Sequence, residues 1–173
     1  MDGPASERTE VREWPIHAQI YRARPDVAAV MHAHPTASTL MAAMGIAVEP
    51  IDQDCAIFTD QLPVLDNCAV SIATPALGDD VARALGKARA LLLRNHGSIV
   101  ASGSLAEVCV TAYRLEKVAE TMLRAAAIAP LPLLSTEKKA ALLAARKAAQ
   151  PARPESSHEE RWQMLQDYYL GPG

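Results

Sequence analysis

Two apolar runs that lead into histidines constrain the fold more than any other feature of this sequence. Residues 27–31 precede His32 and His34, and residues 90–93 precede the stretch 94–97, which contains a third histidine. A run that is apolar at consecutive positions, rather than at every second position, is typical of a strand covered on both faces. The sequence therefore predicts a layered α/β domain whose buried strands carry histidines at their ends.

Helices are indicated by their start and stop signals. Pro15 suits a first helical position, and Pro25 disfavours helical geometry just before it, so we expect a short helix over residues 15–24. Ser104 and Glu107 have the spacing of a capping box and predict the start of a long helix. We also expect helices over residues 37–44 and 78–85, a returning strand over 98–101, and strand candidates at 46–48, 62–65 and 70–72.

The two ends of the chain differ from its middle. Residues 1–12 are polar and charged without apolar periodicity, which predicts a polar N-terminal arm. The sequence Ala-Pro-Leu-Pro at 129–132 ends the long helix and predicts a stiff connector to further helical segments. We therefore expect one domain over residues 13–128 and a helical C-terminal extension over residues 129–173, which packs on the domain or on a neighbouring subunit.

Charge and cysteine content exclude several classes of partner and location. With 17 basic and 20 acidic residues, the chain has no excess of either sign that would favour nucleic acid or a membrane surface. A small molecule is the expected partner. Cys55, Cys68 and Cys109 are odd in number and lack metal-type spacing, and no leader pattern begins the sequence, which favours the cytoplasm. No window approaches the roughly 18 apolar residues of a membrane-spanning helix.

The histidines are the first candidates for chemistry. Side chains two positions apart on a strand point to the same face, so His32 and His34 can share one ion. A zinc site that does chemistry commonly uses three protein ligands, and His96 is the natural third. The alternative is that His32 and His34 are partly exposed residues at a strand end. His17 and His158 compete for the third place, and we expect both to be solvated.

Several short motifs lie between residues 13 and 116. They are Glu13-Trp14-Pro15-Ile16-His17, Ile20-Tyr21-Arg22-Ala23-Arg24-Pro25-Asp26-Val27, His32-Ala33-His34, Leu93-Arg94-Asn95-His96-Gly97, and Gly103-Ser104-Leu105 with Glu116. In order and spacing they closely resemble the class II aldolase/adducin family over roughly Glu13 to Ala127. Because several separate motifs agree, coincidence is a poor explanation, although each motif alone is weak.

The resemblance implies a fold and a set of roles. The implied fold class is α/β, a three-layer α/β/α domain around a central mixed, largely antiparallel sheet. It implies that His32, His34 and His96 bind Zn2+, or another divalent metal such as Mn2+ or Co2+, and that Glu13 is the acid/base carboxylate. A cation held by neutral imidazoles keeps its double charge and can stabilise an enolate as a carbon–carbon bond breaks. The alternative for Glu13 is a negative group that favours the dipole of the nearby helix.

Two departures from the family bear on the substrate. Members that act on sugar phosphates have a segment before the position of Glu13 that cradles phosphate, and this chain is N-terminally short of it. They also tend to carry paired serines directly before the glutamate, where this chain has Val11 and Arg12. Arg12 can bind a substrate carboxylate in bidentate fashion, or be a solvated surface charge. Asn95 is a second candidate for substrate binding by its place in its motif.

The expected function is that of a metal-dependent carbon–carbon lyase, performing retro-aldol cleavage or decarboxylation of a small hydroxy or keto carboxylate or a sugar-derived substrate. Family epimerases are expected to have aspartate at the position of Glu13, which disfavours epimerisation. The alternatives are a non-catalytic, adducin-like interaction module and a truncated inactive homologue. The resemblance also implies a homo-oligomer, with a tetramer expected. Tyr168 and Tyr169 are candidates to reach a neighbour's site, or else pack the last helix.

Overall fold

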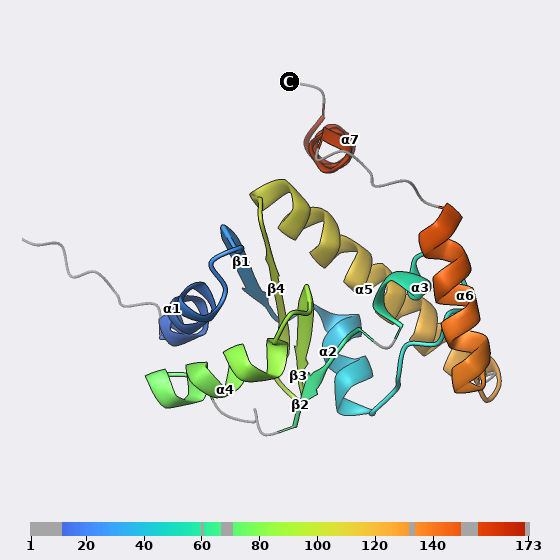
Figure 1. The fold of residues 1–173 in the computed structure, drawn as a ribbon, viewed down its shortest axis with the longest axis horizontal. Coiled ribbons are helices and arrows are strands. Elements are labelled where there is room, and N and C mark those ends of the chain that lie inside the picture. The colour runs from blue at the N-terminus through green and yellow to red at the C-terminus, as the bar shows by residue number, and fades with distance from the viewer. Residues whose placement is uncertain (1–11, 60, 67–70, 132–133, 150–155, 172–173) are drawn as a thin grey trace, which may run out of the picture.

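The computed structural model of the protein describes residues 12–59, 61–66, 71–131, 134–149 and 156–171 (Figure 1). Its elements in chain order are α1 (Trp14–Ala23), β1 (Ala29–Ala33), α2 (Thr36–Ala43), α3 (Cys55–Phe58), β2 (Val64–Leu65), α4 (Pro75–Leu85), β3 (Ala90–Leu93), β4 (Gly97–Ser102), α5 (Leu105–Ile128), α6 (Thr136–Ala149) and α7 (Ser156–Leu170). Within the described ranges, no helix combines the length and hydropathy that crossing a bilayer requires.

The four strands form one sheet in the order β1-β4-β3-β2. Strand β4 pairs antiparallel with both β1 and β3, whereas β2 pairs parallel with β3. The two apolar runs of the sequence therefore contain the strands on either side of β4. Strand β3 is buried as expected, whereas β1 is an edge strand and its five residues are only partly buried. The expected mixed, largely antiparallel sheet is confirmed.

Helices cover both faces of this sheet (Figure 1). On one face, Leu91 and Ile99 pack with apolar residues of α1 and α4. On the other, Leu92 and Val100 pack with residues of α2, α3 and α5. Alternate residues of β3 thus enter separate cores, and in β1 Met31 packs against one core and Val30 against the other, which is why both runs are apolar throughout. Each fully buried aliphatic side chain contributes about 1.5–3 kcal/mol to the stability of the fold. The expected three-layer α/β/α class is confirmed.

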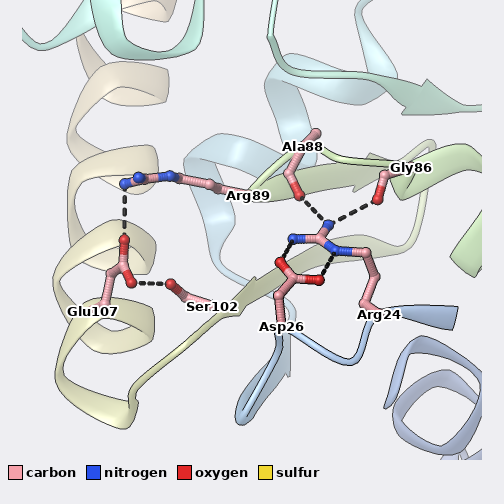
Figure 2. Close-up of polar contacts among 7 residues, drawn as sticks. All are labelled: Arg24, Asp26, Gly86, Ala88, Arg89, Ser102 and Glu107. Atoms are coloured by element: carbon pink, nitrogen blue, oxygen red, sulfur yellow. Dashed lines mark hydrogen bonds and ion pairs between the residues drawn. The ribbon is translucent and has the colours of Figure 1, made fainter. Parts of the chain in front are cut away.

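The start of α5 follows the expected capping pattern only in part. The hydroxyl of Ser104 accepts a hydrogen bond from the N–H of Glu107 at 3.1 Å, as an N-cap should. The carboxylate of Glu107 does not complete a capping box. It contacts the hydroxyl of Ser102 and pairs with Arg89, with 2.8 Å between Nη1 and Oε1 (Figure 2). Glu107 therefore ties α5 to the sheet.

One arginine ties the link before β1 to the link before β3. Arg24 donates from Nε and Nη2 to the carboxylate of Asp26 at 2.8 and 2.7 Å (Figure 2). Its Nη1 donates to the carbonyl oxygens of Gly86 and Ala88 at 2.8 and 3.3 Å. A planar guanidinium fork suits this bidentate contact. Because Arg24 follows α1, these bonds also hold that helix, and Glu13 before it, against the sheet.

The additional strand candidates were mostly wrong. Residues 46–48 are irregular chain after α2, and Val48 is apolar because it packs into the core beside α2 and α3. Of the candidate 62–65, only the last two residues form a strand. In the candidate 70–72, Val70 lies outside the described residues, and the next two residues are not in a strand. Burial in an irregular segment therefore gave the same apolar signal as strand pairing.

Helix boundaries also differ from expectation. Helix α4 begins at Pro75 rather than at residue 78, because Thr74 is its N-cap and accepts from the N–H of Leu77 at 3.4 Å. Helix α3 was not predicted, since a single turn is too short to show apolar periodicity.

The helical segments expected after the connector form as α6 and α7. Among its described residues, α6 has none that is buried, but its Lys139 forms an ion pair of 2.6 Å with Glu49, which is 2% exposed. Helix α7 contacts α5, where the rings of Tyr113 and Tyr169 have centroids 6.5 Å apart. The division of the chain at residue 128 stays a prediction.

Candidate metal centre

The three histidines of the sequence motifs meet at one end of the sheet. His32 lies on β1, His34 directly follows that strand, and His96 lies in the turn between β3 and β4. Since β1 is antiparallel to β4, its C-terminal end lies beside the start of β4 and therefore beside this turn. The ring centroids are 4.8, 4.9 and 5.0 Å apart. Strand pairing thus accounts for the grouping that the spacing predicted.

A glycine makes this grouping possible. An added Cβ at Gly97 would lie 2.4 Å from the carbonyl oxygen of Ala33 and 2.6 Å from the ring of His34. Such distances exclude a side chain, so only glycine lets the end of β1 approach β4 this closely. In the same turn, Asn95 has a φ of 59° and is exposed. Asparagine tolerates this left-handed conformation better than most residues, and substrate binding by Asn95 stays a prediction.

Glu13 brings a carboxylate to the three rings. It occupies the N-cap position of α1, but its side chain makes no capping hydrogen bond. Instead, Oε2 lies 3.0 Å from Nε2 of His32, and Oε1 lies 3.3 Å from Nε2 of His96. The side chain is 17% exposed, so it stays accessible from outside. Because the side chain of Glu13 points to the histidines, a role in the candidate metal centre is favoured over a role as a charge at the helix terminus.

The loop before α4 holds Glu13 from the other side. The hydroxyl of Ser71 and the N–H of Ile72 donate to Oε1 at 3.1 and 2.9 Å. Burial raises the pKa of Glu13, but the hydrogen bond from Ile72, the charges of His32 and His96, and the bond from Ser71 together outweigh it, and the pKa lies below its ordinary value. The carboxylate is therefore ionised at neutral pH.

Ser71 and Ile72 were missed as site residues. Their segment was interpreted as a strand candidate, and a serine beside a buried isoleucine carries no chemical motif. Only the packing of this loop against the start of α1 shows that the two residues reach Glu13.

His32 is arranged to offer a lone pair to the centre. Its Nδ1 lies 3.1 Å from the carbonyl oxygen of Ser98, which favours the tautomer that donates from Nδ1. Its Nε2 then faces Glu13 and also lies 3.1 Å from Nε2 of His34. Burial lowers the pKa of His32 despite that bond and the charge of Glu13, so the ring is neutral at neutral pH. A neutral, oriented imidazole is the form that binds a metal.

The four side chains fit a divalent cation. One donor atom from each of Glu13, His32, His34 and His96 can be chosen so that all four lie within 4.8 Å of one another. Three imidazoles are the ligand set of catalytic zinc sites, with further positions left for water, substrate or a carboxylate. The same mixture of nitrogen and oxygen donors also accepts Mn2+ or Co2+. The donor chemistry therefore matches the expected metal.

A second glutamate supports the segment that carries His34. The carboxylate of Glu116, on α5, accepts hydrogen bonds from the N–H groups of Ala37 and Ser38 at 2.7 and 2.9 Å. Pro35, at the N-cap of α2, provides no capping side chain, so Glu116 satisfies the first turn from outside the helix. Glu116 thereby fixes the chain immediately after His34. The sequence motif contained this residue but did not indicate this contact.

The other expected residues lie elsewhere. Arg12 is exposed in the turn before α1, next to Glu13 in the chain, and forms no ion pair among the described residues. His17 is half-buried on α1, where burial lowers its pKa. His158 has a buried Nδ1 and lies against α5. The expectation that both histidines are solvated is therefore wrong. Tyr168 and Tyr169 are 81% and 62% exposed on α7 and do not reach the centre of their own chain.

Comparison with known proteins agrees with this architecture. Residues 2–123 match the model of the Class II Aldolase and Adducin N-terminal domain. The decarboxylase NovR of Streptomyces niveus is 32% identical over 111 residues, covering 61% of this chain and 41% of NovR. The L-fuculose phosphate aldolase of Escherichia coli K12 is 32% identical over 135 residues, covering 76% of this chain and 61% of that enzyme.

A solved structure is similar over almost the whole chain. The aldolase II superfamily protein from Pseudomonas syringae superposes with a TM-score of 0.76 at 20% identity, covering 97% of this chain and 67% of that one. At this identity the likeness shows the fold alone. The chain spans about two fifths of NovR and about three fifths of the fuculose phosphate aldolase.

Proposed function

Because this chain belongs to the class II aldolase and adducin family, we propose that it is a metal-dependent carbon–carbon lyase. Its curated relatives include an aldolase and a decarboxylase, which both break carbon–carbon bonds. The observation that carries the proposal is the convergence of an ionised carboxylate, Glu13, with three imidazoles at one end of the sheet. We propose that the substrate is a small hydroxy or keto carboxylate.

His32, His34 and His96 would hold the cation, with zinc as our first choice and Mn2+ or Co2+ as alternatives. When bound, such a cation polarises a substrate carbonyl and stabilises the negative charge that develops as the carbon–carbon bond breaks. The sequence positions of the three residues, at the ends of adjacent strands, give the ligands a rigid support. Gly97 and Glu116 maintain that support.

Glu13 would move the proton. The carboxylate is ionised at neutral pH, so it can accept the proton of a substrate hydroxyl in retro-aldol cleavage and then pass that proton to the carbon released from the broken bond. In a decarboxylation, the same carboxylate would first take the proton of a substrate hydroxyl and then pass that proton to the carbon that loses carbon dioxide. Ser71 and Ile72 orient Oε1, while Oε2 faces His32. A carboxylate held at both oxygens is positioned before substrate arrives, which lowers the cost of reaching the reactive geometry.

Arg12 favours a substrate that carries a carboxylate. It is exposed and adjacent to Glu13, so its guanidinium can lie near the centre when a substrate binds. A carboxylate matches the guanidinium fork and can accept two hydrogen bonds from it. Asn95, which neighbours His96 in the turn, is our second candidate for substrate contact.

The test is an activity panel combined with metal analysis. The full chain, purified and loaded with zinc, is incubated with hydroxy-keto acids and, in parallel, with L-fuculose 1-phosphate, while pyruvate, aldehyde and carbon dioxide are measured. We expect turnover of a carboxylate substrate and about one metal ion per chain, with the metal lost in His96→Ala and retained in His17→Ala. Cleavage of sugar phosphates alone would overturn the substrate assignment, and absence of metal from the wild-type chain would overturn the centre.

A non-catalytic interaction module is the second candidate, because the family model that the chain matches describes adducin as well as class II aldolase. Stoichiometric metal binding without turnover of any compound in the panel would favour this candidate over a lyase.

We also propose that the protein forms a homo-oligomer, with a tetramer as the expected form. Met164, Tyr168 and Leu170 expose apolar surface on α7 that a neighbouring subunit would cover. Sedimentation velocity measures this directly. A cytoplasmic location stays a prediction.

A further inference from the structure

A cleft of about 890 Å³ lies away from the metal centre, between α3, α6, α7 and the adjoining parts of α5 and the sheet. Arg89, at its wall, immediately precedes β3, whereas His96 follows the other end of that strand. A strand of this length spans on the order of 13 Å. The cleft is therefore a separate place on the molecule, and its volume is in the range of small-molecule sites.

The walls of this cleft carry an excess of positive charge. Four arginines and a lysine line it, contributed by three helices and one loop, and a histidine lies among them. The only carboxylate among its described lining residues belongs to Asp54. The positively charged residues and the histidine are Arg89, Arg114, Arg146, Lys147, Arg161 and His158. Five permanent charges therefore face a single carboxylate, on a chain whose overall formal charge is −3.

Only part of this charge is neutralised within the described structure. Arg89 pairs with Glu107 at 2.8 Å (Figure 2), and Arg114 pairs with Asp54 at 3.4 Å. By contrast, Arg146, Lys147 and Arg161 form no ion pair with a described residue. Ion pairs thus hold two of the arginines in place, while the charges on α6 and α7 that line the cleft have no counter-ion among the residues that the structure describes.

Two polar atoms at the cleft are buried without a hydrogen-bond partner among the described residues. They are Nη1 of Arg146 and Nδ1 of His158. A guanidinium cannot lose its proton to relieve the cost of burial, so a buried, unpaired guanidinium nitrogen requires an acceptor. An anion inside the cleft would supply that acceptor and would also offset the positive charge of the lining residues.

We propose that this cleft binds a small organic molecule that carries several negative charges, as phosphate or carboxylate groups. Arg146, Lys147 and Arg161 bind the anionic groups, because guanidinium forks match phosphate and carboxylate oxygens. Ile57 and Leu143, which also line the cleft, contact the carbon skeleton of the molecule. The site is independent of the metal ligands, so occupancy of one does not require the other.

The test is calorimetric titration of the full chain with pyrophosphate and, separately, with tricarballylate, at constant ionic strength, in zinc-loaded and metal-free protein. We expect both forms to bind the better of the two probes equally. The Arg146→Gln/Arg161→Gln variant should bind it at least about tenfold more weakly, a change of about 1.4 kcal/mol. The matched variant Lys87→Gln/Lys138→Gln removes the same charge from exposed positions outside the cleft and should stay within about twofold of wild type.

Several outcomes would overturn the proposal. Equal affinity in wild type and Arg146→Gln/Arg161→Gln, or binding that disappears with the metal, would place the probe elsewhere. Failure of both probes to bind at millimolar concentration, together with a changed mass of the variant in sedimentation velocity, would identify the cleft as a contact between copies of this chain. The same failure with an unchanged mass would show the cleft to be a solvated surface. If the double variant does not fold, Lys147→Gln, which removes an exposed charge of α6, replaces it.

Discussion

The two ends of β3 carry contrasting arrangements of charge. At one end, the carboxylate of Glu13 is matched by histidines, a hydroxyl and a backbone N–H, all supplied by strand ends, a turn and one ordered loop. At the other end, cations of α6 and α7 face a cleft with one carboxylate among its described lining residues. The sheet determines the geometry of the first site, whereas helices with little buried surface determine the second. The metal centre should therefore respond strongly to local changes in geometry, and the cleft chiefly to charge.

The largest expected effect comes from Glu13→Gln, which keeps the shape of the side chain and removes its charge. We expect kcat/KM to fall by roughly 10²- to 10⁴-fold, because proton transfer is lost, while the three histidines still bind metal. Steady-state kinetics on the best substrate of the panel, with metal content measured in the same preparation, provides the check. Glu120→Gln, on the surface of α5, is the control and should leave kcat/KM unchanged. Full activity in Glu13→Gln would assign the proton transfer to another group.

Gly97→Ala tests whether close approach of β1 and β4 sets the metal centre. The added methyl group would overlap the carbonyl of Ala33 and the ring of His34, so we expect zinc affinity to fall by roughly 10- to 100-fold. Unfolding free energy should fall by about 1–3 kcal/mol. Competitive titration with a chelator dye measures the affinity, and urea denaturation measures the stability.

Gly103→Ala is the matched control for that substitution. The nearest atom to its added Cβ is the carbonyl oxygen of Asp26 at 3.7 Å, an ordinary contact. Equal effects of the two substitutions would show that the geometry at Gly97 is not what holds the histidines together.

Glu116→Ala tests the support behind His34. Removal of the carboxylate leaves the N–H groups of Ala37 and Ser38 without acceptors, and we expect a loss of about 1 kcal/mol in unfolding free energy. Zinc affinity should fall less than in Gly97→Ala, because the strand pairing is intact. In Glu120→Ala, which loses only a surface ion pair on the same helix, urea denaturation should give the wild-type value. A wild-type value for Glu116→Ala would mean that water replaces the cap.

The smallest expected effect concerns pH. Burial lowers the pKa of His17 below 6.5, so as pH falls the unfolded chain takes up this proton before the folded chain does. The unfolding free energy of metal-free protein should therefore fall from about pH 8 to about pH 5.5, and less so in His17→Gln. Urea denaturation across this range tests the difference.

The main residues of the candidate site were predictable from the sequence, whereas the residues that hold them in place were not. His32 and His34 share a face because of their spacing on a strand, and His96 ends the other apolar run, so the grouping was visible in the sequence. Glu13 was predicted as a site residue from the resemblance to a family, since nothing in the neighbouring sequence indicates where its side chain points. Ser71, Ile72 and Glu116 were not predictable in their roles, because each acts through a hydrogen bond to a residue at least 58 positions away in the chain.

The sequence by itself determined the layered α/β class, the strands β1, β3 and β4, and the set of candidate metal donors that lie at their ends. These features rest on local periodicity, spacing and short motifs, which operate within a few residues. Only the tertiary structure decided that residues 46–48 enter the core without strand pairing, that Glu13 turns away from its helix, and that cations from four separate segments surround one cleft. Such features depend on which segments pack together, and side chains far apart in the chain interact only after the backbone has brought them within a few ångströms.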